Sequence, residues 1–133
     1  MIAVQVAFEP NSRQRAASRA SAARRYPAHV ARQLALAHAL QRRVDGGEFT
    51  DHATMARDLG FTRARISQLM DLLLLAPDIQ EELLFLEVPA GKQPLSERTL
   101  REAVLRSLDW NEQQRRWDSL RSSIPALQRP NEP

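Results

Sequence analysis

Side chains that could catalyse a reaction are sparse in this chain. It has no cysteine, which excludes disulfides, thiolate nucleophiles and cysteine-ligated zinc sites. The three histidines, His29, His38 and His52, are not spaced to form a metal pair beside a carboxylate. Neither a nucleophile elbow nor a glycine-rich phosphate loop is present. The sequence therefore predicts a protein that is not an enzyme, with no metal, cofactor or small-molecule substrate.

A different chemistry, hydrogen bonding to DNA, is indicated by the polar residues of segment 62–71, TRARISQLMD. Arg63 and Arg65 fall in the first turn of a predicted helix that Thr62 caps. The helix dipole disfavours cations at this end, so a phosphate group or a guanine edge would explain two arginines there. We expect Arg63 and Gln68 to contact base edges and Arg65 to contact either a base or a phosphate.

The other candidate contacts extend this surface. His52 begins the preceding helix, where its imidazole would face phosphate or solvent. Arg24 and Arg25 end a run of arginines. The alternative interpretation of segment 52–71 is an ordinary helical hairpin with a solvated polar face. The full set of predicted DNA-binding residues is Thr62, Arg63, Ala64, Arg65, Ser67, Gln68, Asp71, His52, Arg24 and Arg25.

The elements that must position these residues form a predicted helix-turn-helix over His52–Asp71. Ala56 falls where the two helices cross, and a larger side chain would push them apart. Gly60 follows the first helix, where a left-handed turn costs glycine nothing. Ile66 and Leu69 point back into the angle between the helices, toward Met55 and Leu59.

Length and charge set the limits for the whole molecule. With 133 residues, 43% of them hydrophobic, the chain can hold one modest core plus tails. There is no apolar run long enough to span a membrane and no signal peptide, so we expect a cytoplasmic, nucleoid-associated protein. The net charge of +3 is uneven: residues 1–46 carry +6 and residues 47–133 carry −3.

The predicted fold class is all-α, with a three-helix core extended by three further helices. Apolar spacing and caps, Asp51, Thr62 and Ser96 among them, predict this order. Leu84 and Phe85 make the fourth helix apolar nearly all round, so it should be buried. Asn111 is the expected cap of the last helix, with Trp110 and Trp117 on its apolar side. The predicted ranges are 28–44, 51–59, 62–75, 77–86, 97–108 and 112–122.

The two ends of the chain are predicted to lie outside this domain. Residues 2–8 alternate like a strand, with no second strand to pair with them. Residues 11–25 hold five arginines among Ala and Ser, which predicts an arm that is flexible when free and follows DNA phosphates when bound. A plain solvated tail is the alternative. The predicted domains are an N-terminal segment 1–26, a DNA-binding domain 27–122 and a flexible tail 123–133.

The order of these elements resembles the DNA-binding domain of ParB-type partition proteins, including KorB-like repressors. The resemblance covers about residues 28–122. It rests on MARDLGFTRARISQLMDLLLLAPDIQEELL, where the two helices lead into leucines, a proline and Ile-Gln-Glu. A second block, PLSERTLREAVLRSLDWNEQQRRWDSL, continues it. The resemblance implies sequence-specific duplex recognition by Thr62, Arg63, Arg65, Ser67 and Gln68.

Two departures from that family narrow what the resemblance implies. Arg24–Arg25 lacks the Gly/Glu context of the family's phosphate motif and the nucleotide-binding domain around it. We also expect the family's separate C-terminal dimerisation domain to be missing, because residues 123–133 are too few to form it. The resemblance is therefore to a DNA-reading module standing alone, with CTP hydrolysis and clamp sliding not implied.

The sequence thus predicts a sequence-specific double-stranded DNA-binding protein, a transcriptional regulator of a bacterial, phage or mobile-element gene. The alternative is an accessory or adaptor protein of a recombination or partition system that acts through protein contacts, with leucine-rich segment 72–86 as its docking surface. Because one helix-turn-helix reads few base pairs, we expect a homodimer, at least on DNA. Strand 2–8 and the helix bearing Trp110 and Trp117 are the two candidate interfaces.

Overall fold

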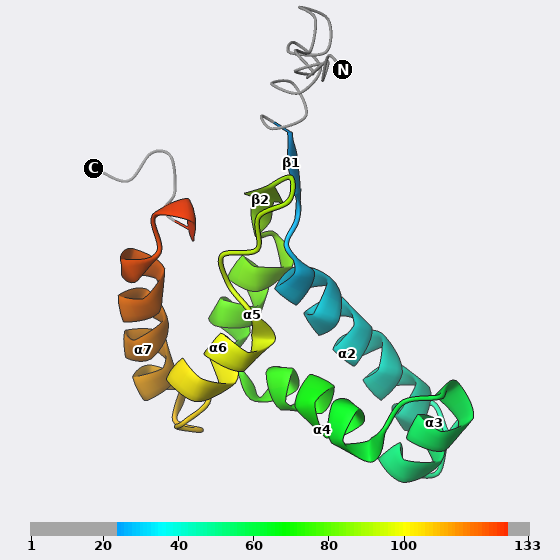
Figure 1. The fold of residues 1–133 in the computed structure, drawn as a ribbon. Helices are drawn as coiled ribbons and strands as arrows, with labels where there is room; N and C mark the ends of the chain where they lie inside the picture. The colour runs from blue at the N-terminus through cyan, green and yellow to red at the C-terminus, as the bar shows by residue number, and fades with distance from the viewer. Residues whose placement is uncertain (1–23, 128–133) are drawn as a thin grey trace, which may run out of the picture.

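The computed structural model describes residues 24–127, and this part of the chain is mainly helical with one small antiparallel sheet (Figure 1). The all-α fold class is therefore confirmed in outline. The elements are, in order, β1 (Arg25–Pro27), α2 (His29–Asp45), α3 (His52–Leu59), α4 (Arg63–Asp71), the 3-10 helix η1 (Leu72–Leu74), α5 (Pro77–Leu84), β2 (Glu87–Pro89), α6 (Glu97–Ala103), α7 (Trp110–Ser123) and the 3-10 helix η2 (Pro125–Leu127).

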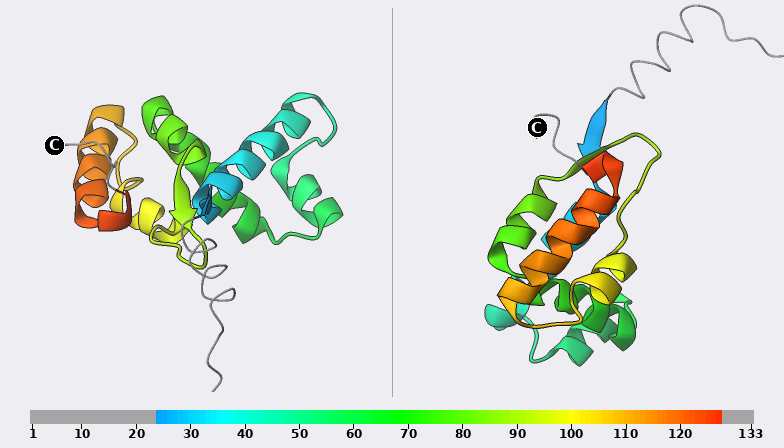
Figure 2. Two further views of the ribbon diagram at one scale, coloured as in Figure 1. Left: turned by 90° about the horizontal axis from the view of Figure 1, so that it is seen from above. Right: turned by 90° about the vertical axis from the view of Figure 1, so that its left-hand side faces the viewer.

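The 17-residue helix α2 connects the two halves of the molecule. Helix α3 lies at one end of the structure and α7 at the other, with α2 and α5 between them (Figure 2, left). The N-terminal half of α2 packs against α5, whereas its C-terminal half contacts α4. The residues of its buried face, which recur at helical spacing, are Val30, Leu34, Ala37 and Leu40.

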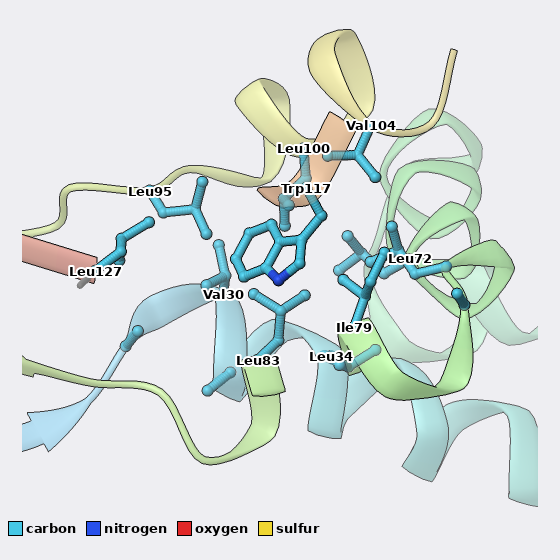
Figure 3. Close-up of a cluster of buried hydrophobic side chains, with 14 of the residues drawn as sticks. Val30, Leu34, Leu72, Ile79, Leu83, Leu95, Leu100, Val104, Trp117 and Leu127 are labelled. Atoms are coloured by element: carbon cyan, nitrogen blue, oxygen red, sulfur yellow. The ribbon is translucent and has the colours of Figure 1, made fainter. Parts of the chain in front are cut away.

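Two hydrophobic clusters form along this helix. The small cluster joins α2, α3 and α4 and contains Ala37, Leu40, Phe49, Met55, Ala56, Ile66 and Leu69. The large cluster is centred on the Trp117 indole (Figure 3) and contains Ala28, Val30, Ala31, Leu34, Leu72, Leu75, Ala76, Ile79, Leu83, Val88, Leu95, Leu100, Val104, Trp117 and Leu127.

A buried glutamine fixes the junction between α4 and α5. The helical path breaks at Leu75, and Pro77 begins α5 as the sequence predicts. Gln113 of α7 is fully buried, and its Oε1 accepts a hydrogen bond from the Ala76 N–H at 2.7 Å. Its Nε2 donates to the carbonyl oxygens of Leu74 and Ser107 at 3.1 and 2.9 Å. One side chain thus satisfies three backbone groups that the breaks in the helices leave unpaired.

Two predicted helix ends in the C-terminal half are wrong. Helix α6 stops at Ala103 rather than at residue 108, and Leu108 is 67% exposed in the following loop. Helix α7 begins at Trp110 with Asp109 as its N-cap, so Asn111 is not the cap. At the end of α6 the Leu105 N–H bonds to the Leu100 carbonyl, five residues back, which breaks the α-helical pattern. The Gln113 N–H bonds to the Asp109 carbonyl at the start of α7, and the Gln113 side chain bonds to the Ser107 carbonyl in the loop between the two helices.

The prediction that segment 77–86 is buried all round is also wrong. Ile79 and Leu83 are buried, but Leu84 is 39% exposed and Phe85 is 79% exposed. Helix α5 ends at Leu84, and Phe85 lies just beyond it as the C-cap residue. Because only one stripe of this short helix faces α2 and α7, the rest of its apolar surface meets solvent.

The sheet is absent from the elements that the sequence predicts. Arg25 falls in the predicted basic arm and Val88 falls between two predicted helices, yet Tyr26 pairs with Val88 across the antiparallel strands β1 and β2. Burial of Val88 against the large cluster positions this ribbon. Residue Leu127, expected in a flexible tail, is also buried in that cluster. Strand 2–8, most of the arm and residues 128–133 lie outside the described residues.

No helix within residues 24–127 is both long and apolar enough to cross a membrane.

Candidate nucleic-acid interface

The turn between α3 and α4 has the geometry that the sequence predicts. Gly60 adopts a left-handed conformation, with φ 76° and ψ 21°. Its N–H and the N–H of Phe61 both donate to the Ala56 carbonyl, which ends α3 and redirects the chain. A Cβ atom at residue 60 would meet no heavy atom within 4 Å, so the backbone angle alone requires glycine here.

The predicted contact residues between the two helices are buried. Ala56 is 1% exposed, and Met55 and Leu69 are fully buried. Ile66 lies in the same cluster, with Leu59 partly buried against it. Phe49 covers the cluster from the preceding loop, and the Arg43 guanidinium lies 5.0 Å from its ring centre. Helix α4 is therefore held to α3 and α2 by one face only.

Side-chain caps define where both helices begin. The Asp51 carboxylate accepts a hydrogen bond from the Thr54 N–H at 2.7 Å, as predicted. This bond, then the Thr54 hydroxyl and more weakly Arg57 and Arg63, hold the pKa of Asp51 below its usual range. The Thr62 hydroxyl accepts from the Arg65 N–H at 3.0 Å, which confirms the predicted start of α4.

The outward face of α4 carries most of the predicted site residues. Arg63, Ala64 and Ser67 are exposed, and Gln68 and Asp71 are half-buried. Thr62, at the cap, is exposed on the same side of the turn. Within residues 24–127 the side chains of Arg63, Ser67 and Gln68 make no hydrogen bond or ion pair. The hydrogen-bonding atoms of these three side chains are therefore available to an external partner.

Arg65 is placed differently from the other α4 residues. Its Nη1 lies 2.6 Å from Oε2 of Glu97, the first residue of α6. Glu97 is 6% exposed, and its other oxygen lies 3.7 Å from Nε of Arg101. A buried carboxylate shared by two arginines therefore ties α4 to α6. The sequence predicts only a DNA contact for Arg65, because nothing in it identifies a partner 32 residues away.

His52, the first residue of α3, contacts α2. Its Nε2 is 3.2 Å from Oε1 of Gln41, and the ring is exposed. His38 is occupied elsewhere, with its Nε2 2.7 Å from Oε1 of Gln80. Within the described residues, no three His, Asp or Glu side chains gather as a group that could hold a metal ion.

The structure does not bring Arg24 and Arg25 together with the α4 residues. These arginines lie at the start of α2, whereas α3 follows its other end (Figure 1). A 17-residue helix is about 25 Å long at 1.5 Å per residue. Arg25 instead bonds to the ribbon, with Nη2 donating to the Glu87 carbonyl at 2.8 Å.

Glu97 and Gln113, which contact α4 and the segment that follows it, are not among the residues predicted from the sequence. Gln113 lies four residues before Trp117, so it shares the buried face of α7. A polar residue at this spacing from a buried tryptophan indicates a buried side chain that forms hydrogen bonds. Glu97 gave no such signal, because an acid in the first turn of a helix is common for dipole reasons alone.

Comparisons of the chain with protein-family models, with curated protein sequences and with solved structures find no match.

Proposed function

We propose that the protein binds double-stranded DNA sequence-specifically, with α3 and α4 as a helix-turn-helix and α4 in the major groove. One observation carries the proposal: α4 buries one face against α3 and α2, while Arg63, Ser67 and Gln68 on its other face make no hydrogen bond to the described protein. Arginine and glutamine at such positions match the hydrogen-bonding edges of guanine and adenine.

The role proposed for such binding is transcriptional regulation in a bacterial, phage or mobile-element genome. It rests on the resemblance of the element order to ParB-type DNA-binding domains. The left-handed turn at Gly60 and the proline that begins α5 support it, because both occur where that resemblance requires them. Binding rather than catalysis is proposed, with no cofactor.

The sharpest test removes the proposed base contacts. A preferred duplex would first be selected from a randomised pool, and affinity would then be measured by fluorescence anisotropy. Arg63→Ala and Gln68→Ala should each cost about 1–3 kcal/mol on the preferred duplex and less on random duplex. Arg98→Ala is the matched control, because Arg98 is an exposed arginine paired with Glu102 on α6. Equal losses on both duplexes would reassign Arg63 and Gln68 to phosphate contacts.

A homodimer on DNA is part of the proposal. Two copies related by a two-fold axis would double the length of the site that is read. Of the two tryptophans on the predicted interface helix, Trp117 is 2% exposed in the core and Trp110 is 58% exposed. Trp110 therefore supplies the available contact on α7. Sedimentation of the specific complex should give two protomers per duplex, and one protomer on a site without inverted symmetry would contradict the proposal.

An adaptor that acts through protein contacts is the second candidate function. It is favoured by the exposure of Phe85 at 79% and Leu84 at 39%, since large apolar side chains that meet solvent together often mark a binding surface. Capture of a protein partner that is lost in Phe85→Ser, with no change in any DNA affinity, would favour this function.

A further inference from the structure

A groove between α5 and α7 has an acidic rim and an apolar floor. Its volume is about 710 Å³. Asp78, Glu81 and Glu82 reach it from α5, and Glu87 reaches it from β2. Its apolar lining includes Phe85, Leu86, Trp117 and Leu127, and its two cations are Arg25 and Arg121.

Only part of this negative charge is neutralised within the groove. Oε2 of Glu82 accepts from the Trp117 indole N–H at 2.9 Å and from Nη1 of Arg121 at 3.0 Å. Within residues 24–127 the carboxylates of Asp78, Glu81 and Glu87 make no ion pair or hydrogen bond. Asp78 lies three residues from Glu81 and four from Glu82, a spacing at which like charges on a helix repel. A cationic ligand would relieve that repulsion.

The chain itself holds a segment of complementary charge, and it enters the fold at this groove. Residues 11–25 contain five arginines and no acidic residue. The last of them, Arg25, already lines the groove. Thirteen residues, 11–23, can extend about 40 Å at roughly 3.3 Å each, whereas eight-residue α5 is about 12 Å long. The arginines at 13, 15 and 19 are therefore within reach of the acidic rim.

We propose that segment 11–23 binds the α5–α7 groove of its own chain through its arginines, and that DNA phosphates compete for the same arginines. The competition rests on the proposed function, whereas the contact between segment and groove does not. Direct connection gives the segment a high effective concentration at the groove, so weak surface ion pairs suffice to hold it. Duplex binding through these arginines would then require their release from the groove.

The contact is tested without DNA on the full chain. The two tryptophans provide two indole N–H signals in a ¹H–¹⁵N spectrum, Trp117 in the groove and Trp110 away from it. Replacing Arg13, Arg15 and Arg19 by serine should shift the Trp117 signal and the amide signals of Glu81 and Glu87, and leave Trp110 in place. Added salt should produce the same shift in the unmodified chain. Unchanged groove signals would overturn the proposal, and a shift that depends on protein concentration would overturn binding within one chain.

The competition is tested by a double-mutant cycle on random duplex. Glu81→Gln with Glu87→Gln should tighten binding about three- to tenfold by releasing the arginines. That gain should vanish when Arg13, Arg15 and Arg19 are serine. Glu102→Gln with Glu112→Gln removes the same charge outside the groove and should give an equal, small effect in both backgrounds. A groove gain that persists without the arginines would overturn the competition. Absence of any DNA binding would instead refute the proposed function and leave the spectroscopic test valid.

Discussion

The small and large clusters differ in how far apart along the chain their residues lie. The small cluster uses residues between 37 and 69, whereas the large cluster uses residues between 28 and 127. The small cluster depends on local features, a cap at Asp51, a turn at Gly60 and a cap at Thr62. The large cluster depends on polar contacts between distant residues, of which Gln113 with Ala76 is the most buried. Helix α4, the proposed DNA-contacting helix, is therefore formed by local interactions, whereas its position in the molecule depends on contacts between residues far apart in the sequence.

The largest expected effect is on the large cluster. Trp117→Ala should lower the free energy of unfolding by about 3–5 kcal/mol, because it leaves a cavity among Val30, Leu83 and Leu100 (Figure 3). It also removes the hydrogen bond to Glu82. Trp110→Ala is the matched control, since Trp110 is 58% exposed. Chemical denaturation of both variants checks this, and similar midpoints would show that Trp117 does not organise the core.

A smaller effect is expected from overpacking the small cluster. Ala56→Leu should destabilise the protein by about 1–3 kcal/mol, because Ala56 is 1% exposed between α3 and α4. Ala39→Leu, on the exposed face of α2, is the control. Thermal unfolding gives the comparison. If the two variants melt alike, the helices do not meet at Ala56.

The ion pair that joins the two regions should contribute less. Glu97→Gln should lower the free energy of unfolding by roughly 1–2 kcal/mol, because the buried partner of Arg65 loses its charge. The loss is kept small because solvent reaches Arg65 and weakens the ion pair. Glu102→Gln, on the same helix but paired at the surface with Arg98, should change stability little. Denaturant midpoints of the two variants decide this, and a larger loss in Glu102→Gln would show that Glu97 does not link α4 to α6.

The smallest effect is a pH dependence at the start of α3. The pKa of Asp51 is lowered in the folded state, so the ionised carboxylate stabilises the fold at pH values above the usual pKa of an aspartate. This stabilisation is lost as the pH falls through the lowered pKa. Asp51→Asn keeps an acceptor oxygen but cannot titrate. The stability difference between the unmodified chain and Asp51→Asn should therefore shrink on acidification from pH 6 to about pH 3. A difference that stays constant across this range would contradict the assignment.

The sequence by itself determined the parts of the molecule whose physics is local. A left-handed glycine, side-chain caps and helical spacing act within a few residues, so Gly60, Asp51, Thr62 and the buried Ile66 and Leu69 were all predictable. The six helices and their order follow from the same signals.

Only the tertiary structure decided which polar groups meet across the chain. It placed Gln113 against a helix break 37 residues away, paired Arg65 with Glu97, and left Phe85 exposed while burying Leu127. It also paired Tyr26 with Val88 in the antiparallel sheet. It placed the acidic residues of α5 in the same groove as Arg25, the last residue of the arginine-rich segment. Such pairings depend on how whole helices pack, and a helix has too little local information to specify its distant partners.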